Sequence, residues 1–307
     1  MFFVSRIVGV PLVVVGALAA TAACGRDEGV HTARASASAS TAALRDDFGD
    51  TVALTRPFTR VVSLNPTTTE ALFAMGAGSR LIGRSHWDQW PVAAQRLPDL
   101  GPGIRPNLEI VLGTRPDLVL LYASADNRPA AARLRAAGIA TYATRVDAIE
   151  QFRRTTRDLG RLIGDTAAAR AVIDSVDREL AAVRVRTGTL PHPKVLLPTW
   201  DSPLIVIGGG SHLSELVAIA GGRNVYADDP APSPQVAFED VVRRDPDVIL
   251  TGPEGRERIL ASPRWRTLRA VREGRVFAYD TMVVGRPSVT LGRAAMNLAT
   301  LLHPRGR

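Results

Sequence analysis

The sequence contains one cysteine, Cys24, so no disulfide bond can form within a single chain. Lysine is nearly absent as well, because Lys194 is the only one and arginine supplies almost all of the positive charge. Aromatic residues make up only 5% of the chain, and no basic run is interleaved with them. Nucleic-acid binding is therefore not indicated, although the formal net charge is +8.

Motifs of common enzyme classes are also missing. The chain has no Gly-x-Ser-x-Gly, no Cys-x-x-Cys, no His-Glu-x-x-His and no Walker loop. Its five histidines are scattered, without the spacing that is typical of a metal site. We therefore expect binding without catalysis, with no cofactor and no resident metal. A metal-dependent enzyme on a two-lobed scaffold is the alternative from a different class.

Residues 1–23 are predicted to be a signal peptide, with Arg6 as the positive charge before an apolar run. Cys24 follows two alanines and precedes a glycine, a context that resembles a bacterial lipoprotein signal. In such a signal the cysteine becomes the lipidated N-terminus after cleavage. Thr21 stands where the signal usually has leucine, so cleavage by an ordinary signal peptidase is the alternative.

Residues 24–47 are rich in alanine, serine and threonine. Such a segment cannot bury enough apolar surface to offset the entropy lost on ordering, so it is predicted to be a flexible tether. The remaining chain is predicted to form an N-terminal lobe (48–146), linking helices (147–187) and a C-terminal lobe (188–307).

The linking segment holds two helical patterns without proline, separated by Gly164. Asp165 or Thr166 can cap the start of the second pattern, and Thr187-Gly188 ends it. About 22 residues at ~1.5 Å each would span ~33 Å, roughly the width of a small domain. The apolar stripe of this amphipathic helix consists of residues at spacings of three and four, namely Ala169, Val172, Ile173, Val176, Leu180 and Val183.

Two similar segments lie on either side of this helix, at 107–121 and 237–251. Each contains a short helical pattern, a turn, Pro-Asp and a buried strand, and Pro116 and Pro246 are 130 residues apart. Strands that alternate with short helices indicate a parallel sheet. The predicted fold is therefore α/β, with two Rossmann-like lobes of parallel sheet joined by one long backbone helix.

Local signals predict several further features of each lobe. In the first, Thr67 to Thr69 offer capping hydroxyls to the helix that follows strand 60–64. In the second, 194–197 and 204–207 are predicted strands, and 281–287 a loop. The latter strand runs into Gly208-Gly-Gly-Ser211, where the absence of a following lysine favours tight strand-to-helix packing over a nucleotide loop.

Several motifs occur in an order and spacing that resemble one known family. They are Arg60-Val-Val-Ser-Leu-Asn-Pro-x3-Glu70, an aromatic loop ending in Pro91, Asn107-Leu-Glu, Gly208-Gly-Gly-Ser-His-Leu-Ser-Glu215 and Ala220-Gly-Gly-Arg-Asn224. This pattern is similar to that of the periplasmic vitamin B12 and iron-siderophore binding proteins of ABC importers. The resemblance covers nearly all of the chain from Arg60 and implies two α/β lobes joined by a single long helix.

A ligand held between two lobes needs groups from loops of both. His86, Trp87 and Trp90 form the densest aromatic cluster, and such flat faces suit a macrocycle or planar chelate. Trp200 is the facing candidate in the second lobe, although a tryptophan wedged between strand and helix explains it nearly as well. The resemblance adds the loop from Asp280 to Arg286, whose arginine would pair with an anionic group. His86 is expected to hydrogen-bond rather than to ligate metal.

The resemblance further implies the protein's cargo, partner and location. The expected cargo is cobalamin first, a ferric siderophore second and haem third. In this family one carboxylate on each lobe docks onto the permease, and the motifs assign these roles to Glu109 and Glu215. The chain is therefore expected to be a monomeric receptor on the extracytoplasmic side, anchored to the membrane by lipid on Cys24 and delivering its ligand to an ABC permease.

Overall fold

The computed structural model describes residues 42–304, so the predicted signal peptide, Cys24 and most of the predicted tether lie outside the described residues. The tether was expected to reach residue 47, and this is wrong. Strand β1 (Ala43–Arg45) pairs antiparallel with β2 (Thr51–Ala53). Leu44 is buried in the core of the first lobe, and this apolar contact orders the segment.

Lobe 1 contains a four-stranded parallel sheet in the order β4-β3-β5-β6, as predicted. Its strands are β3 (Val61–Ser63), β4 (Leu81–Arg84), β5 (Leu118–Tyr122) and β6 (Ala140–Thr144). The helices between them are α1 (Pro66–Ala74), α2 (Leu108–Gly113) and α3 (Arg128–Ala136), with short 3-10 turns at Gly78–Arg80, Val92–Arg96 and Ala125–Asn127. The cap of α1 is Asn65, not Thr67 to Thr69. The Asn65 side chain accepts a hydrogen bond from the amide of Thr67, and Pro66 occupies the first helical position, which is favourable for proline.

Lobe 2 repeats this plan with the parallel order β10-β7-β11-β12. Its sheet strands are β7 (Lys194–Leu196), β10 (Arg223–Asn224), β11 (Val248–Thr251) and β12 (Val276–Ala278). The expected strand at 204–207 does form, as β9 (Leu204–Val206), but it pairs antiparallel with β8 (Pro198–Asp201) in a separate hairpin. The helical elements are α6 (His212–Ile219), α7 (Phe238–Arg244), α8 (Pro253–Ala261), η4 (Trp265–Thr267), α9 (Arg269–Arg272), α10 (Thr281–Val284) and α11 (Leu291–Leu302). The loop expected at 281–287 thus contains one short helix.

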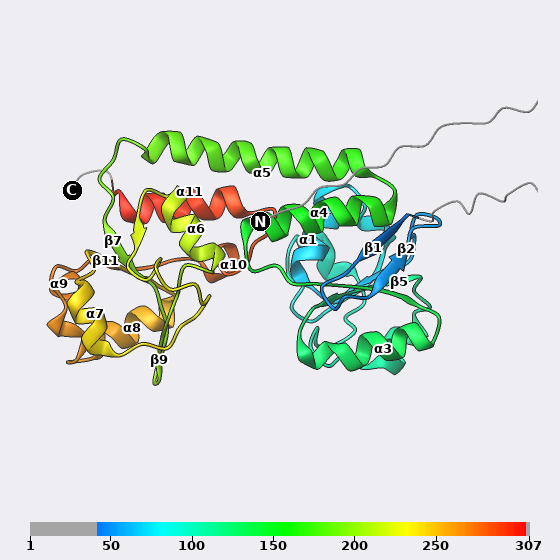
Figure 1. Ribbon diagram of the computed structural model, residues 1–307, viewed down its shortest axis with the longest axis horizontal. Coiled ribbons are helices and arrows are strands. Elements are labelled where there is room, and N and C mark those ends of the chain that lie inside the picture. Colours follow the sequence, from blue (N-terminus) through cyan, green and yellow to red (C-terminus); the bar gives the residue numbers. More distant parts are fainter. Residues whose placement is uncertain (1–41, 305–307) are drawn as a thin grey trace, which may run out of the picture. The chain divides into compact units, whose positions relative to one another are not determined.

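The two linking helices are α4 (Ile149–Ile163) and α5 (Thr166–Thr187). Gly164 between them has φ 72°, the left-handed conformation that glycine adopts without strain. The Asp165 side chain caps α5 by accepting the amide of Ala168 at 2.9 Å. Figure 1 shows α5 as a continuous rod that runs along both lobes.

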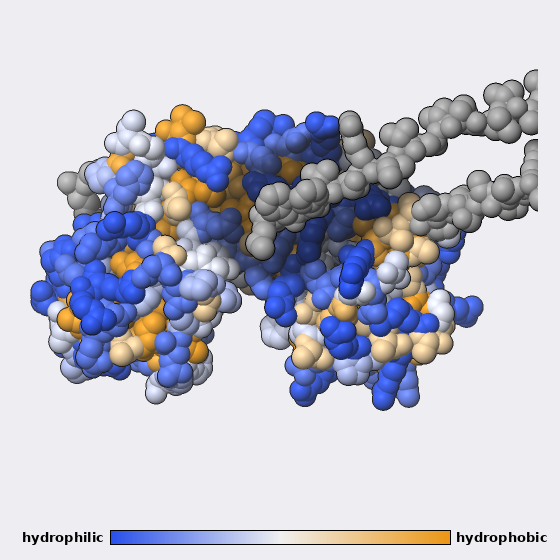
Figure 2. Space-filling model, viewed as in Figure 1, coloured by the Kyte–Doolittle hydropathy of each residue, from blue (hydrophilic) through white to orange (hydrophobic). Residues whose placement is uncertain are grey.

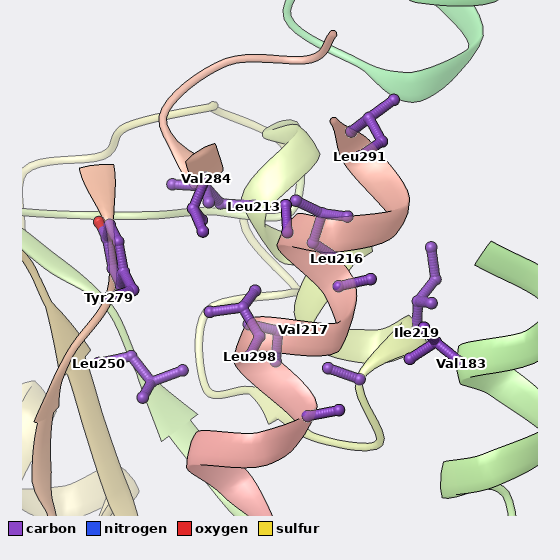
Figure 3. Packing of buried hydrophobic residues seen from close by; sticks show 14 of the residues in the cluster. Val183, Leu213, Leu216, Val217, Ile219, Leu250, Tyr279, Val284, Leu291 and Leu298 are labelled. Carbon is purple, nitrogen blue, oxygen red and sulfur yellow. The ribbon is translucent and has the colours of Figure 1, made fainter. Parts of the chain in front are cut away.

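The rod contributes to both hydrophobic cores. Ala169, near its start, belongs to the core of lobe 1, together with Leu159 of α4. Val176 and Val183 belong to the core of lobe 2, where Figure 3 shows Val183 beside Ile219 and the α6 and α11 side chains. A 22-residue helix fixed at each end by buried side chains resists bending, so we infer that it limits how far the lobes can move apart.

Candidate functional site

A cleft of about 600 Å³ lies between the lobes, and Figure 2 shows the molecule hollowed there. Lobe 1 supplies Asn65, Thr67 and Tyr122 to its walls, and the start of the linking segment supplies Asp147. Lobe 2 supplies residues that include Ile207, Ser211, His212, Ser233, Tyr279 and Arg286. Most of these residues follow the carboxyl ends of strands. Parallel strands end at one edge of a sheet, which is where α/β folds bind ligands.

The cleft contains an ion pair that joins the two lobes. Arg286 donates to Oε1 of Glu70, with its Nε at 2.9 Å and its Nη2 also in contact. The Glu70 side chain is only 2% exposed and that of Arg286 24%. Burial raises the pKa of Glu70, and the neighbouring guanidinium opposes this rise. Thr67 Oγ1 adds a second link by donating to the carbonyl of Pro287 at 3.0 Å.

A second buried carboxylate, Asp88, lies near this ion pair. Its Oδ2 accepts the Ser85 amide at 2.8 Å and the Ser85 hydroxyl, whereas its Oδ1 has no hydrogen-bond partner within the described chain. Burial raises the pKa of Asp88 from its usual 3.8, despite these hydrogen bonds and the charge of Arg286.

Asp88 should therefore make the stability of the fold depend on pH. Its folded-state pKa lies above its unfolded value, so its stabilising contribution is complete below pH 3.8 and is lost as the pH rises through the folded pKa. Urea unfolding of the wild type and of Asp88→Asn at pH 7 and pH 5 measures this. The wild type is expected to gain free energy of unfolding relative to the variant as the pH falls. Equal differences at both pH values would refute the assignment.

The remaining polar groups of the cleft are mainly neutral. Tyr122 donates its hydroxyl to Asp147 at 3.1 Å, and burial raises the pKa of Tyr279. Burial lowers the pKa of His212, whose Nε2 lies 3.0 Å from the carbonyl oxygen of Val284. Arg286, already paired with Glu70, is the only arginine among the lining residues that belong to the described part of the chain. Within residues 42–304 the cleft thus offers hydroxyl groups and apolar surface, but no uncompensated arginine or lysine.

The aromatic loop does not line this cleft, contrary to expectation. His86 Nδ1 lies 3.1 Å from Asp99, which holds the imidazole at the surface, and Trp87 is 63% exposed. The guanidinium of Arg293, from lobe 2, lies 5.8 Å from the ring centroid of Trp90. His86 hydrogen-bonds within the described chain, as expected, and contact between this loop and a ligand stays a prediction.

The predicted residues of lobe 2 have different surroundings. Trp200 is 59% exposed and lines a cavity of about 460 Å³ that shares Thr199, Tyr279 and Thr281 with the cleft. The alternative prediction, that Trp200 is wedged between strand and helix, is therefore wrong, because the side chain is exposed and lines an extension of the cleft. Asp280 does not line either cavity and instead caps α10 by accepting the amide of Met282 at 2.9 Å. Arg286 lines the cleft, although its guanidinium is paired with the carboxylate of Glu70.

Sequence reasoning missed most of the lining residues, among them Tyr122 and Tyr279. Tyr122 ends β5 and Tyr279 directly follows β12, and this position at the carboxyl end of a strand was the available signal. The glycine-rich turn packs tightly, although against the backbone of the loop at 227–231 and not between strand and helix as expected. A Cβ at Gly208 would lie within 2.1 Å of the Ala231 carbonyl oxygen, and one at Gly210 within 2.2 Å of that of Pro230.

The two predicted docking carboxylates differ in their surroundings. Glu109 is exposed near the start of α2. Glu215 is half-buried, and its Oε1 accepts the amide of Ile149 at 3.1 Å, so it caps α4 across the lobe boundary. The internal repeat points instead to Glu239, which lies 130 residues after Glu109 and is exposed near the start of α7. We therefore replace Glu215 with Glu239 as the candidate on lobe 2.

Within residues 42–304, no three or more His, Cys, Asp and Glu side chains gather as a metal site would require. In the same part of the chain, no helix combines the length and the apolar character needed to cross a membrane.

Comparison with known proteins agrees with this architecture. Residues 61–282 match the family model described as periplasmic binding protein. The vitamin B12-binding protein of Vibrio parahaemolyticus is 26% identical over 242 residues, covering 78% of this chain and 88% of that protein. The periplasmic haem-binding protein RhuT of Roseiflexus superposes with a TM-score of 0.70 at 26% identity over 79% of this chain and 97% of that one. The vitamin B12-binding protein BtuF of Vibrio cholerae has a TM-score of 0.68 at 24% identity, covering 80% and 97%.

Proposed function

Because the chain belongs to the periplasmic binding protein family, we propose that it is the cobalamin receptor of an ABC importer. Family membership makes it a periplasmic protein with a small-molecule ligand and a transporter partner. We further propose that the chain captures a corrinoid between its lobes, acts as a monomer without catalysis and is anchored by lipid on Cys24.

The charge of the cleft carries the choice of ligand. Its arginine, Arg286, is already neutralised by Glu70, and its other polar groups include the hydroxyls of Tyr122 and Tyr279. An anionic chelate, such as a ferric catecholate or haem with two propionates, would need an uncompensated cation to replace its hydration. Corrinoids carry neutral amide side chains around the ring, which hydroxyl groups and apolar walls can bind. The vitamin B12-binding relative supports the same choice.

Haem is the second candidate, because two tyrosines line the cleft and tyrosine is a known haem ligand. Isothermal titration with cyanocobalamin, haemin, a ferric catecholate and a ferric hydroxamate discriminates between these ligands. Cyanocobalamin is expected to bind most tightly and to be recovered unchanged on release. Tighter binding of haemin or of a siderophore would overturn the cobalamin assignment, and turnover of any ligand would indicate an enzyme.

The docking proposal predicts a loss of transport without a loss of binding. Glu109→Ala combined with Glu239→Ala removes two exposed carboxylates that would pair with cations of the permease, and such pairs contribute about 2 kcal/mol or more when desolvated. When uptake of the ligand is measured in the presence of the transporter, we expect it to fall at least tenfold in the double variant. The Kd of the variant for the ligand should be unchanged. Glu215→Ala is the matched comparison, because its lost cap should lower stability without abolishing docking. Normal uptake by the double variant would contradict the assignment.

A further inference from the structure

Positive charge is concentrated in one segment of lobe 2. Residues 254–275 contain seven arginines against three glutamates and form α8, η4, α9 and the approach to β12. Two of these arginines are paired, Arg258 with Glu254 and Arg269 with Asp247. Arg264, Arg266 and Arg272 are exposed and form no ion pair within the described residues. We call these three residues the basic surface.

Buried neighbours hold the basic surface in place. Trp265 is only 1% exposed, and its Nε1 donates to Asp201 at 3.0 Å, so it anchors the turn that carries Arg264 and Arg266. Arg272 Nη1 reaches the carbonyl oxygens of Thr267 at 2.5 Å and of Arg266 at 3.5 Å. The three exposed arginines therefore lie around one turn that buried side chains fix.

This surface adjoins the docking helix. The guanidinium of Arg264 lies 4.1 Å from the ring centroid of Phe238, and Phe238 packs edge-to-face on Trp265 with ring centroids 5.2 Å apart. The residue after Phe238 is Glu239, the candidate docking carboxylate. If Glu239 faces the permease, the basic surface beside it faces the rim of the permease and the lipid around it.

We propose that Arg264, Arg266 and Arg272 bind the anionic phospholipid headgroups that border the permease. The location rests on the proposed docking of Glu239, whereas lipid binding itself does not. Guanidinium groups pair well with phosphate oxygens, and an anionic surface contributes about 1 kcal/mol for each nearby arginine, or about fivefold in affinity. The contact would hold the receptor beside its permease in the orientation that Glu109 and Glu239 require.

The test uses residues 41–307, which form one compact unit. This choice removes the apolar run near the N-terminus, which would itself insert into lipid. Co-sedimentation is measured with vesicles of phosphatidylglycerol and phosphatidylcholine and with vesicles of phosphatidylcholine alone. The variant Arg264→Gln/Arg266→Gln/Arg272→Gln is compared with Arg178→Gln/Arg184→Gln/Arg186→Gln on α5. The control also removes three exposed arginines that have no ion pair within residues 42–304.

The wild type is expected to bind the anionic vesicles, and added salt should weaken the binding. The lobe 2 variant should lose about 100-fold in affinity, whereas the α5 variant should lose no more than about threefold. Equal losses in both variants would show that only net charge matters and would overturn the proposal, as would equal binding to neutral vesicles. Titration with cyanocobalamin separates the two hypotheses. A chain with the expected lipid pattern but no cobalamin binding refutes the proposed ligand and leaves the lipid site standing.

Discussion

Replacing Ser233 with tryptophan is expected to weaken binding of cyanocobalamin by about 60-fold. Ser233 is an exposed lining residue of the cleft, so a large ring there occupies ligand space without entering a hydrophobic core. If the ring denies the ligand about 100 Å² of apolar contact, the loss is about 2.5 kcal/mol. Since a factor of ten corresponds to about 1.4 kcal/mol, this is about 60-fold in Kd. Isothermal titration of both proteins measures the change.

Ser79→Trp provides the matched control for this substitution. Ser79 is also exposed, but it lies in the 3-10 turn Gly78–Arg80 and does not line the cleft. Its Kd should equal that of the wild type, and urea unfolding should show that both variants are folded. Wild-type affinity in Ser233→Trp would mean that the ligand binds elsewhere, and the cleft would then no longer be the candidate site.

Removing the carboxylate of Glu70 is expected to lower the free energy of unfolding by about 3 kcal/mol, because it leaves a largely buried guanidinium unpaired. The pair joins residues 216 positions apart and links the two lobes, so its loss should also loosen their relative placement. Urea unfolding of Glu70→Ala measures the first effect. Ligand affinity should fall as well, because Arg286 then faces the cleft with an uncompensated charge.

Glu150→Ala is the control for that experiment. Glu150 also pairs with arginines, Arg153 at 3.1 Å and Arg157 at 2.8 Å, but its side chain is 66% exposed. Water screens such a pair, so its removal should change stability by no more than about 1 kcal/mol. A similar loss of free energy of unfolding in both variants would show that the Glu70–Arg286 pair stabilises the protein no more than an exposed ion pair does.

The sequence predicted the lobes and the rod because their signals are local. Apolar spacing, Gly164 and the cap at Asp165 lie within one segment, and each acts on the backbone next to it. The parallel sheets followed from the alternation of strands and helices. The strand at 204–207 was also predicted, but its antiparallel pairing with β8 was not, since nothing in these residues says which neighbouring strand will pair with them.

The candidate site was less predictable than the fold. Composition singled out His86, Trp87 and Trp90, yet none of them is among the described residues that line the cleft, and their contact with a ligand stays a prediction. The internal repeat places Glu239 at a distance of 130 residues from Glu109 and so predicts it as the equivalent residue of lobe 2, whereas the family motif points to Glu215. Only the structure revealed that Glu215 is engaged in capping α4.

By itself the sequence determined two α/β lobes, a rigid connecting helix and a family of transport receptors, because periodicity, caps and motif order are properties of neighbouring residues. The tertiary structure alone decided which side chains line the cleft and what charge it carries. That charge depends on Glu70 and Arg286, which are distant in the chain and which folding buries together. Burial and ion pairing between such distant residues are consequences of packing, and no local pattern encodes them.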